Sequence, residues 1–153
     1  MKGKKVDHSG AGCGIARALD MVGDRWSLLI IRQAFYGQQR FGEFQKSLGL
    51  AKNILSTRLK KLVGDGIFRI EEDPASALSH RYILTRAGER LCVILVALWQ
   101  WGAENCFKDE DFGLVMVDKV NVRPLAKVEI QADDGRILGP GDFRVVDLGA
   151  VAR

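Results

Sequence analysis

The sequence contains few cysteines and histidines, and it lacks the short motifs that mark common catalytic sites. Its three cysteines, Cys13, Cys92 and Cys106, are odd in number and show no C-x-x-C spacing. This argues against a disulfide framework and against a zinc site. The two histidines stand far apart, and no G-x-x-x-x-G-K-S/T, H-E-x-x-H or G-x-S-x-G motif occurs. We therefore expect no metal, no cofactor and no enzymatic activity.

Long hydrophobic runs are also absent. No apolar run approaches the ~18 residues of a membrane span. Residues 1–13 are basic and glycine-rich, without the apolar stretch of a secretory signal. The chain has 153 residues, of which 47% are hydrophobic and 27% charged, which is typical of one soluble globular domain. We expect a cytoplasmic protein that does not bind membranes.

Positive charge is concentrated in the first two thirds of the chain. Residues 1–106 carry 16 Lys and Arg against 10 Asp and Glu, whereas residues 107–153 carry 7 against 9. Between residues 46 and 69, six cations are opposed only by Asp65. Such a local excess is the footprint of a phosphate-binding surface, although a solvated helix face gives the same pattern.

Four helices are predicted before residue 65. Glycines and an N-capping aspartate delimit them, since Gly23 and Gly49 follow apolar periodic segments and Asp24 precedes one. The turn between the last two is only two or three residues long, which forces a steep crossing and predicts a helix-turn-helix. The predicted ranges are Ile15–Val22, Arg25–Phe35, Phe41–Leu48 and a fourth helix that ends near Gly64.

The fourth helix has two distinct faces. Leu55, Leu59 and Leu62 share the side that we expect to be buried. The other side carries short polar groups that can reach base edges, followed by lysines that can reach phosphates. We expect DNA contacts there, with further phosphate contacts near the turn; the alternative is an ordinary exposed face. The candidate residues are Lys46, Lys52, Asn53, Ser56, Thr57, Lys60 and Lys61.

Two strands and a long helix are predicted next. Ile67–Glu71 and Arg81–Leu84 read as strands joined by a loop, Glu72–His80, and Thr85 caps a helix at Arg86–Asn105. The apolar stripe of this helix is broader than one small domain needs, so we expect a homodimer; the alternative is a helix folded back on its own core. Cys92 is expected in the core. The candidate dimerisation residues are Leu91, Leu95, Leu98, Trp99 and Trp101.

The remaining chain is expected to form a small β-rich extension. Leu114–Val117, Ala126–Ala132 and Arg144–Leu148 are rich in residues that favour strands, and a hairpin turn is expected at 133–135. The predicted fold class is therefore α+β, a winged helix-turn-helix domain with a β-rich C-terminal extension. We expect a flexible arm at 1–12, the DNA-binding and dimerisation domain at 13–106, and the extension at 107–153.

Several segments resemble the HxlR-type transcriptional regulators. Residues 13–20 (CGIARALD) and 22–30 (VGDRWSLLI) are similar to the opening of that family. Residues 40–45 (RFGEFQ) and 54–62 (ILSTRLKKL) resemble its helix-turn-helix, and residues 65–67, 82–85 and 87–88 its wing and final helix. The resemblance spans residues 13–105 in order. It implies a homodimer that binds double-stranded DNA and regulates transcription, with Ile54–Leu62 in the major groove.

The resemblance also implies a role for Cys13, because several family members sense oxidants or electrophiles through a cysteine before the first helix. Two features depart from the family. In the wing, acidic residues at 71–73 would repel phosphate, so contacts of the wing with DNA must rest on His80 and Arg81. At the start of the fourth helix, Ala51 stands where relatives often place a capping serine. The acidic wing favours one alternative, a winged helix that docks another protein. A thiol-dependent enzyme would rest on Cys13 alone.

Overall fold

The structure is a computed structural model that describes residues 12–107 and 114–146. The predicted arm at 1–12 therefore lies almost entirely outside the described residues. The last two residues of the predicted strand Arg144–Leu148 lie outside them as well. The chain forms two compact units, Met1–Leu95 and Val96–Arg153. The boundary between them falls within the last helix.

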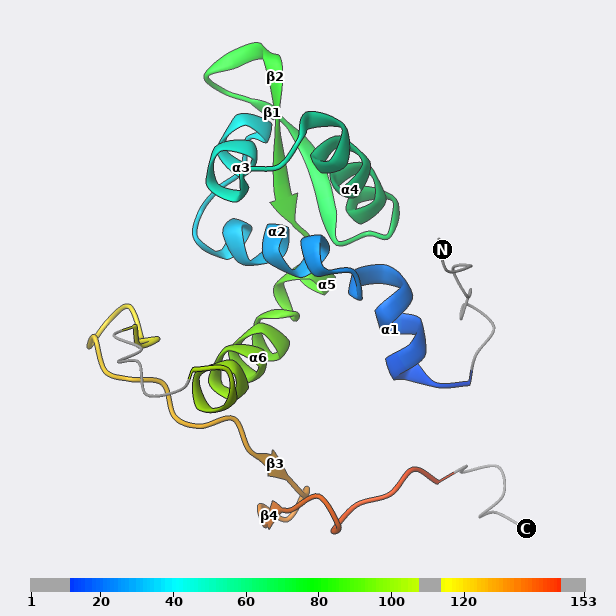
Figure 1. Ribbon diagram of the computed structural model, residues 1–153, viewed down its shortest axis with the longest axis vertical. Coiled ribbons are helices and arrows are strands. Elements are labelled where there is room, and N and C mark those ends of the chain that lie inside the picture. The colour runs from blue at the N-terminus through cyan, green and yellow to red at the C-terminus, as the bar shows by residue number, and fades with distance from the viewer. Residues whose placement is uncertain (1–11, 108–113, 147–153) are drawn as a thin grey trace. The chain divides into compact units, whose positions relative to one another are not determined.

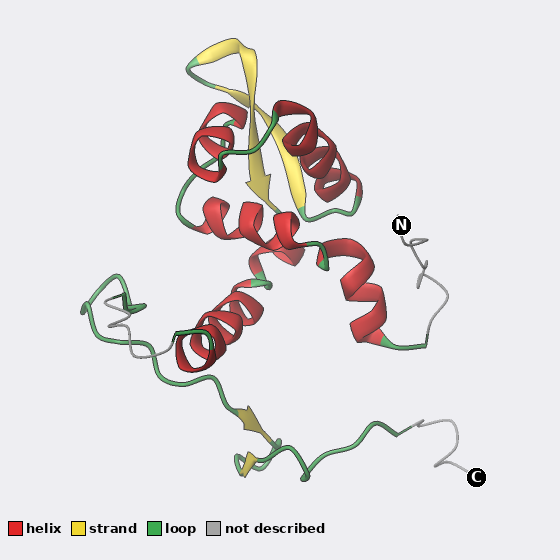
Figure 2. Cartoon of the chain, in the orientation of Figure 1, coloured by secondary structure: helices red, strands yellow, loops and turns green. Residues whose placement is uncertain are grey.

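The first unit is a mixed helix and strand fold of the winged helix-turn-helix type, as predicted. A β-hairpin lies behind the helix-turn-helix pair α3 and α4, and its tip extends beyond both helices (Figures 1 and 2). The elements are α1 (Gly14–Val22), α2 (Arg25–Phe35), α3 (Phe41–Leu48), α4 (Lys52–Gly64), β1 (Phe68–Asp73), β2 (Ser76–Leu84), α5 (Arg86–Glu89) and the first turn of α6 (Cys92–Asn105).

The predicted helix boundaries are set by local hydrogen bonds. The carboxylate of Asp24 accepts bonds from the amides of Trp26 and Ser27, both at 3.1 Å, and so caps α2. Gly49 ends α3 with a φ of 62°, a left-handed conformation that glycine adopts without strain. Ala51 precedes α4 without a side-chain cap, as its sequence position indicated.

The core joins the helix-turn-helix to the hairpin. Leu55, Leu59 and Leu62 of α4 are fully buried, so the predicted inner face of this helix is confirmed. Phe44 of α3 meets Phe68 of β1 and Tyr82 of β2 in edge-to-face contacts, with ring centroids 6.2 and 6.4 Å apart. These apolar contacts fix α3 and α4 against the hairpin.

The wing is the hairpin of β1 and β2. Its strands are longer, and the loop between them is shorter, than predicted. Pairing runs from Phe68 opposite Leu84 to Glu72 opposite His80, and only Pro74 and Ala75 separate the two strands. The predicted loop Glu72–His80 is therefore wrong. Its polar residues belong to a solvent-facing hairpin, which tolerates them as well as a loop does.

The predicted helix Arg86–Asn105 is wrong as one element, because α5 ends at Glu89 and α6 begins at Cys92. Gly88 of α5 lies so close to the Ile67 carbonyl oxygen that an added Cβ would overlap it. This short helix therefore packs directly against the residue that precedes β1. After the break, Leu91 and Leu95 pack against the core. Cys92 is exposed rather than buried, so its predicted place in the core is wrong.

The second unit has less β-structure than predicted. The turn at 133–135 is confirmed, but it joins only two short strands, β3 (Ile130–Gln131) and β4 (Ile137–Leu138). No strand forms over Leu114–Val117, where Val117 makes one isolated bridge with Pro124, nor over the described part of Arg144–Leu148. Strand propensity without neighbouring strands is insufficient. Within the described ranges, no helix is both long and apolar enough to cross a membrane.

Candidate nucleic-acid interface

The outer face of α4 is available to a ligand. Lys52, Asn53, Thr57 and Lys60 are exposed on the side opposite the buried leucines, and Ser56 is half-buried. Lys46, near the end of α3, is also exposed. An outward face of amide, hydroxyl and ammonium groups next to a short turn suits DNA, because the amide can bond base edges while the lysines meet phosphates.

Two other cations of α4 are engaged inside the domain. The Nζ of Lys61 donates to the carbonyl oxygen of Met21 at 3.0 Å and pairs with Asp65. Arg58 Nη1 lies 3.3 Å from Asp24 Oδ2. These contacts join α4 to the last turn of α1 and to the N-terminus of α2. Lys61 is therefore held by other groups, unlike the exposed lysines of the outer face.

The acidic wing is largely neutralised by ion pairs. Glu71 lies 2.8 Å from Arg69 and 3.2 Å from Arg81, and Asp73 pairs with Arg40. The repulsion of phosphate expected from three carboxylates is therefore reduced, and so is the argument for a protein-docking wing. Arg81 also donates to Gln39 Oε1 at 3.3 Å and is half-buried. His80 is the exposed member of the two predicted wing contacts.

A polar clamp joins the wing to the residues that precede α3. Asp73 is buried at the tip of β1, where its carboxylate accepts bonds from Arg40 Nη2 (2.9 Å), the Ala75 amide (3.0 Å) and the Ser79 hydroxyl (3.1 Å). The amide of Tyr82 donates to the Gln39 carbonyl at 2.7 Å. The hydrogen bonds from Arg40 hold the pKa of Asp73 well below its usual range. This clamp fixes the direction in which the wing extends.

The sequence alone gave no reason to assign this role to Asp73, which was counted only as a repulsive charge. One local signal was present, since an aspartate before Pro-Ala can accept a bond from the amide two residues on. Its partner Arg40 lies 33 residues earlier, a separation that no local pattern reveals.

Asp73→Asn should loosen the wing and lower the Tm in a pH-dependent manner. Because the pKa of Asp73 is lower in the folded chain than the ordinary value of about 3.9, its ionised form stabilises the fold above about pH 4. That stabilisation is lost as the pH falls further. The Tm difference between wild type and variant should be largest near neutral pH and should shrink below about pH 4. Thermal melts across pH 2–8 measure it.

Glu72→Gln is the matched control, because it removes the adjacent carboxylate from an exposed side chain. Its melting curve should follow that of the wild type at each pH. A difference for Asp73→Asn that stays constant down to pH 2 would contradict the clamp.

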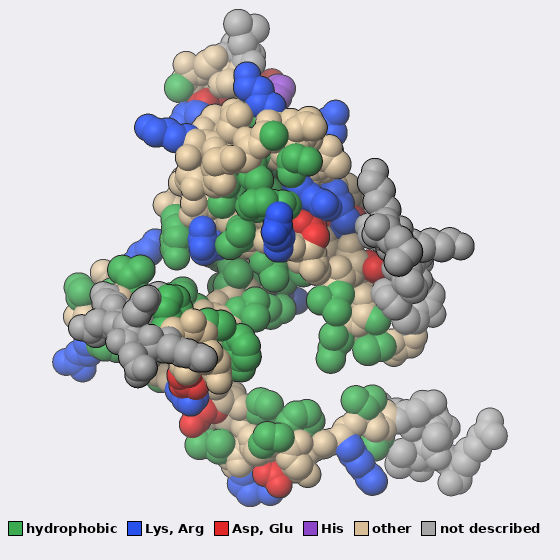
Figure 3. Space-filling model, in the orientation of Figure 1, with side chains coloured by type: hydrophobic (Ala, Val, Ile, Leu, Met, Phe, Trp, Pro, Cys, Tyr) green, Lys and Arg blue, Asp and Glu red, His purple; other side chains and the backbone are tan. Residues whose placement is uncertain are grey.

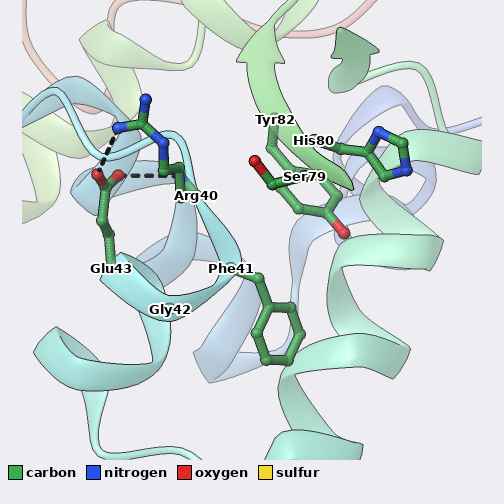
Figure 4. A pocket seen from close by; sticks show the side chains of 7 residues that line it. All are labelled: Arg40, Phe41, Gly42, Glu43, Ser79, His80 and Tyr82. Atoms are coloured by element: carbon green, nitrogen blue, oxygen red, sulfur yellow. Dashed lines mark hydrogen bonds and ion pairs between the residues drawn. The ribbon is translucent and has the colours of Figure 1, made fainter. Parts of the chain in front are cut away.

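A groove of about 600 Å³ lies beside the clamp, between the start of α3 and β2 (Figure 4). Arg40–Glu43 form one wall, and Ser79, His80 and Tyr82 form the other. Burial raises the pKa of the Tyr82 hydroxyl. An occupant of this groove would touch both the helix-turn-helix and the wing.

The other predicted site residues lie outside this interface. Cys13 is exposed and occupies the N-cap position of α1, with no side-chain capping bond. On α6, Leu98 and Trp101 are exposed, at 47% and 60%, and Trp99 is half-buried. Leu91 and Leu95 instead face the core of the first unit.

Comparison with known proteins places this fold in a family. The model described as HxlR-like helix-turn-helix matches residues 21–110, more than half of the chain. The chain therefore belongs to the HxlR-like helix-turn-helix family, in agreement with the resemblance in its sequence.

Individual relatives extend this result. The uncharacterized HTH-type transcriptional regulator Rv3095 of Mycobacterium tuberculosis is 42% identical over 99 residues, which are 65% of this chain and 63% of the relative. The chain thus spans less than two thirds of that relative. The crystal structure of PA1607, described as a candidate transcription factor, aligns with a TM-score of 0.86 and 42% identity over 91% of this chain and 97% of its own. The redox regulator HypR, in its reduced form, aligns with a TM-score of 0.56 and 26% identity over 61% of this chain and 94% of its own.

Proposed function

We propose that the protein is a transcriptional regulator that binds DNA sequence-specifically as a homodimer, with α4 in the major groove. The observation that carries this proposal is the division of α4 into a fully buried leucine face and an exposed polar face. Membership of a helix-turn-helix family, and relatives named as transcriptional regulators, support it.

In this proposal, Asn53 and the hydroxyls of Ser56 and Thr57 face base edges. Lys46, Lys52 and Lys60 neutralise phosphates, and His80 brings the wing to the flanking backbone. Arg81 and Lys61 are less suited to contact DNA directly, because both are bound within the domain. Their expected role is to hold the wing and α4 in place.

The exposed apolar side chains of α6 support the homodimer. Val93, Ile94, Leu98 and Trp101 are 46–60% exposed on this helix. Exposed aromatic and aliphatic groups on one element are typical of an interface. Two copies then present two α4 helices, as palindromic DNA sites require.

Asn53→Ala tests the assignment of α4. DNA selected from a random pool with the wild-type protein supplies the binding site. The variant should lose discrimination at one base position in each half-site by roughly 5- to 150-fold, since one bidentate contact contributes ~1–3 kcal/mol. Binding to random DNA should change little. The control is Asn105→Ala, an exposed amide on α6. Unaltered discrimination in Asn53→Ala would contradict the role of α4.

Cys13 is proposed as a thiol sensor. It is exposed at the start of α1, and HypR, a structural neighbour, is a redox regulator. Oxidant or quinone treatment should alter the affinity of the wild-type protein for its operator at least several-fold, whereas Cys13→Ser should not respond. Cys92→Ser and Cys106→Ser are matched controls, because both thiols are exposed and should leave the response intact. An undiminished response in Cys13→Ser would exclude this role.

A further inference from the structure

The tail, defined here as residues 114–146, leaves an unusual number of apolar side chains uncovered. Of the 22 large hydrophobic residues that are exposed in the described ranges, 12 lie in the tail. Val145 is 99% exposed, Val120 87% and Leu114 70%. Its only paired strands are two residues long, which is too little sheet to form a core. A surface of this kind is normally covered by a partner.

The tail nevertheless has a defined local structure. The side-chain amide of Gln100 binds its backbone as a neighbouring strand would, donating to the Ala126 carbonyl at 2.9 Å and accepting from the Val128 amide at 2.8 Å. Lys127 lies 2.9 Å from Glu104 on the same helix. The carboxylate of Asp118 accepts from three backbone amides of its own turn. Side-chain bonds to the backbone, rather than burial, therefore shape the tail.

The charge of the tail argues for one kind of partner. It carries five Lys and Arg and five Asp and Glu, so its net charge is zero. Nucleic acids and acidic membranes attract surfaces with excess positive charge, which the tail lacks. Figure 3 shows its hydrophobic side chains between cations and anions. Such a mixed surface is suited to another surface of the same composition.

One solved structure contains a counterpart of part of the tail. PA1607 aligns over 91% of this chain, and the uncovered 9% is fewer residues than the tail contains. At least part of the tail therefore has a counterpart in that crystal structure. HypR covers 61% of this chain with 94% of its own, so a large part of this chain has no counterpart in that structure. The tail is an addition to the family domain.

We propose that the tail is a dimerisation arm that packs its exposed apolar side chains against a second copy of this chain. This inference rests on the proposed homodimer and adds a second contact to the one on α6. Gln100 and Glu104 hold the arm on the same helix that carries Leu98 and Trp101, so both proposed contact surfaces adjoin α6. An added apolar strip of this kind brings an interface closer to the 20–30 residues a side of a stable dimer.

The test is the double variant Val120→Asp/Val145→Asp in the full-length chain. Both side chains are almost fully exposed, so their replacement should not disturb the subunit itself, which circular dichroism and the Tm of a dilute sample verify. Sedimentation velocity over a concentration series should show a dimer dissociation constant raised at least 10-fold. Hydrogen exchange should show tail amides that are protected only at concentrations where the wild type is dimeric. Tyr36→Asp is the control, because this side chain is 64% exposed and lies outside the tail; the change should leave dimerisation unchanged.

The outcomes separate the two proposals. A wild-type protein that is monomeric at micromolar concentration would overturn the homodimer and the arm together. Dimers of equal stability in wild type and Val120→Asp/Val145→Asp would overturn the arm alone. Concentration-independent protection of the tail would also overturn it, because the tail would then be covered by its own subunit.

Discussion

A Lys52→Ala/Lys60→Ala variant is expected to bind operator DNA about 10²–10³-fold more weakly than the wild type near 0.15 M salt. Both ammonium groups stand on the exposed face of α4. Each phosphate that a lysine neutralises contributes about −0.9 to the slope of log K against log salt, and a homodimer carries every substitution twice. The slope should therefore become shallower by about 3.6 if four contacts are lost, and by about 1.8 in a monomeric complex. Fluorescence anisotropy at several salt concentrations measures both quantities.

Arg86→Ala/Arg90→Ala is the control for this prediction. It removes the same charge from exposed residues of the α5 region, which lies at the end of the hairpin away from the wing tip (Figure 1). Its slope should stay within one unit of the wild-type value. Equal slopes for wild type and Lys52→Ala/Lys60→Ala would mean that α4 does not face the phosphates.

Phe44→Ala is expected to destabilise the first unit strongly. The ring is fully buried between the helix-turn-helix and both wing strands, where it contacts Phe68 and Tyr82. Removing a buried Phe side chain costs about 3–5 kcal/mol, against a total domain stability of roughly 5–15 kcal/mol. Urea denaturation of the full chain measures this loss, and operator affinity should fall with the folded fraction.

Phe44→Leu separates the loss of volume from the loss of aromatic contacts. It keeps an apolar side chain in place and should cost clearly less than Phe44→Ala. If Phe44→Leu were as stable as the wild type, the aromatic contacts would contribute little to the attachment of the wing.

The helices of the first unit were predictable because their signals are local. Asp24 caps α2 with its own side chain, Gly49 ends α3, and the leucines of α4 recur on one face. In each case the residues that decide the structure lie within one or two turns of one another. The candidate DNA-binding face followed from the same spacing, since what is not buried on α4 must face outward.

The remaining features depend on distant partners. Whether Glu71 and Asp73 repel DNA depends on Arg69, Arg81 and Arg40, and the last of these stands 33 residues from Asp73. The break between α5 and α6 follows from the close approach of Gly88 to Ile67, a tertiary contact. In the tail, strand-favouring residues did not form strands, because the pairing that such residues need is supplied by other segments.

Two cations of α4 bond within the domain and link the orientation of this helix to α1 and to the N-terminus of α2. Lys61 holds the last turn of α1 through the Met21 carbonyl, and Arg58 holds the carboxylate that caps α2. A displacement of α1 must therefore either break these bonds or rotate α4 with it. In the proposed DNA complex, a displacement of the N-terminal helix would therefore change the angle at which α4 meets the bases, without any alteration of the residues proposed to touch them.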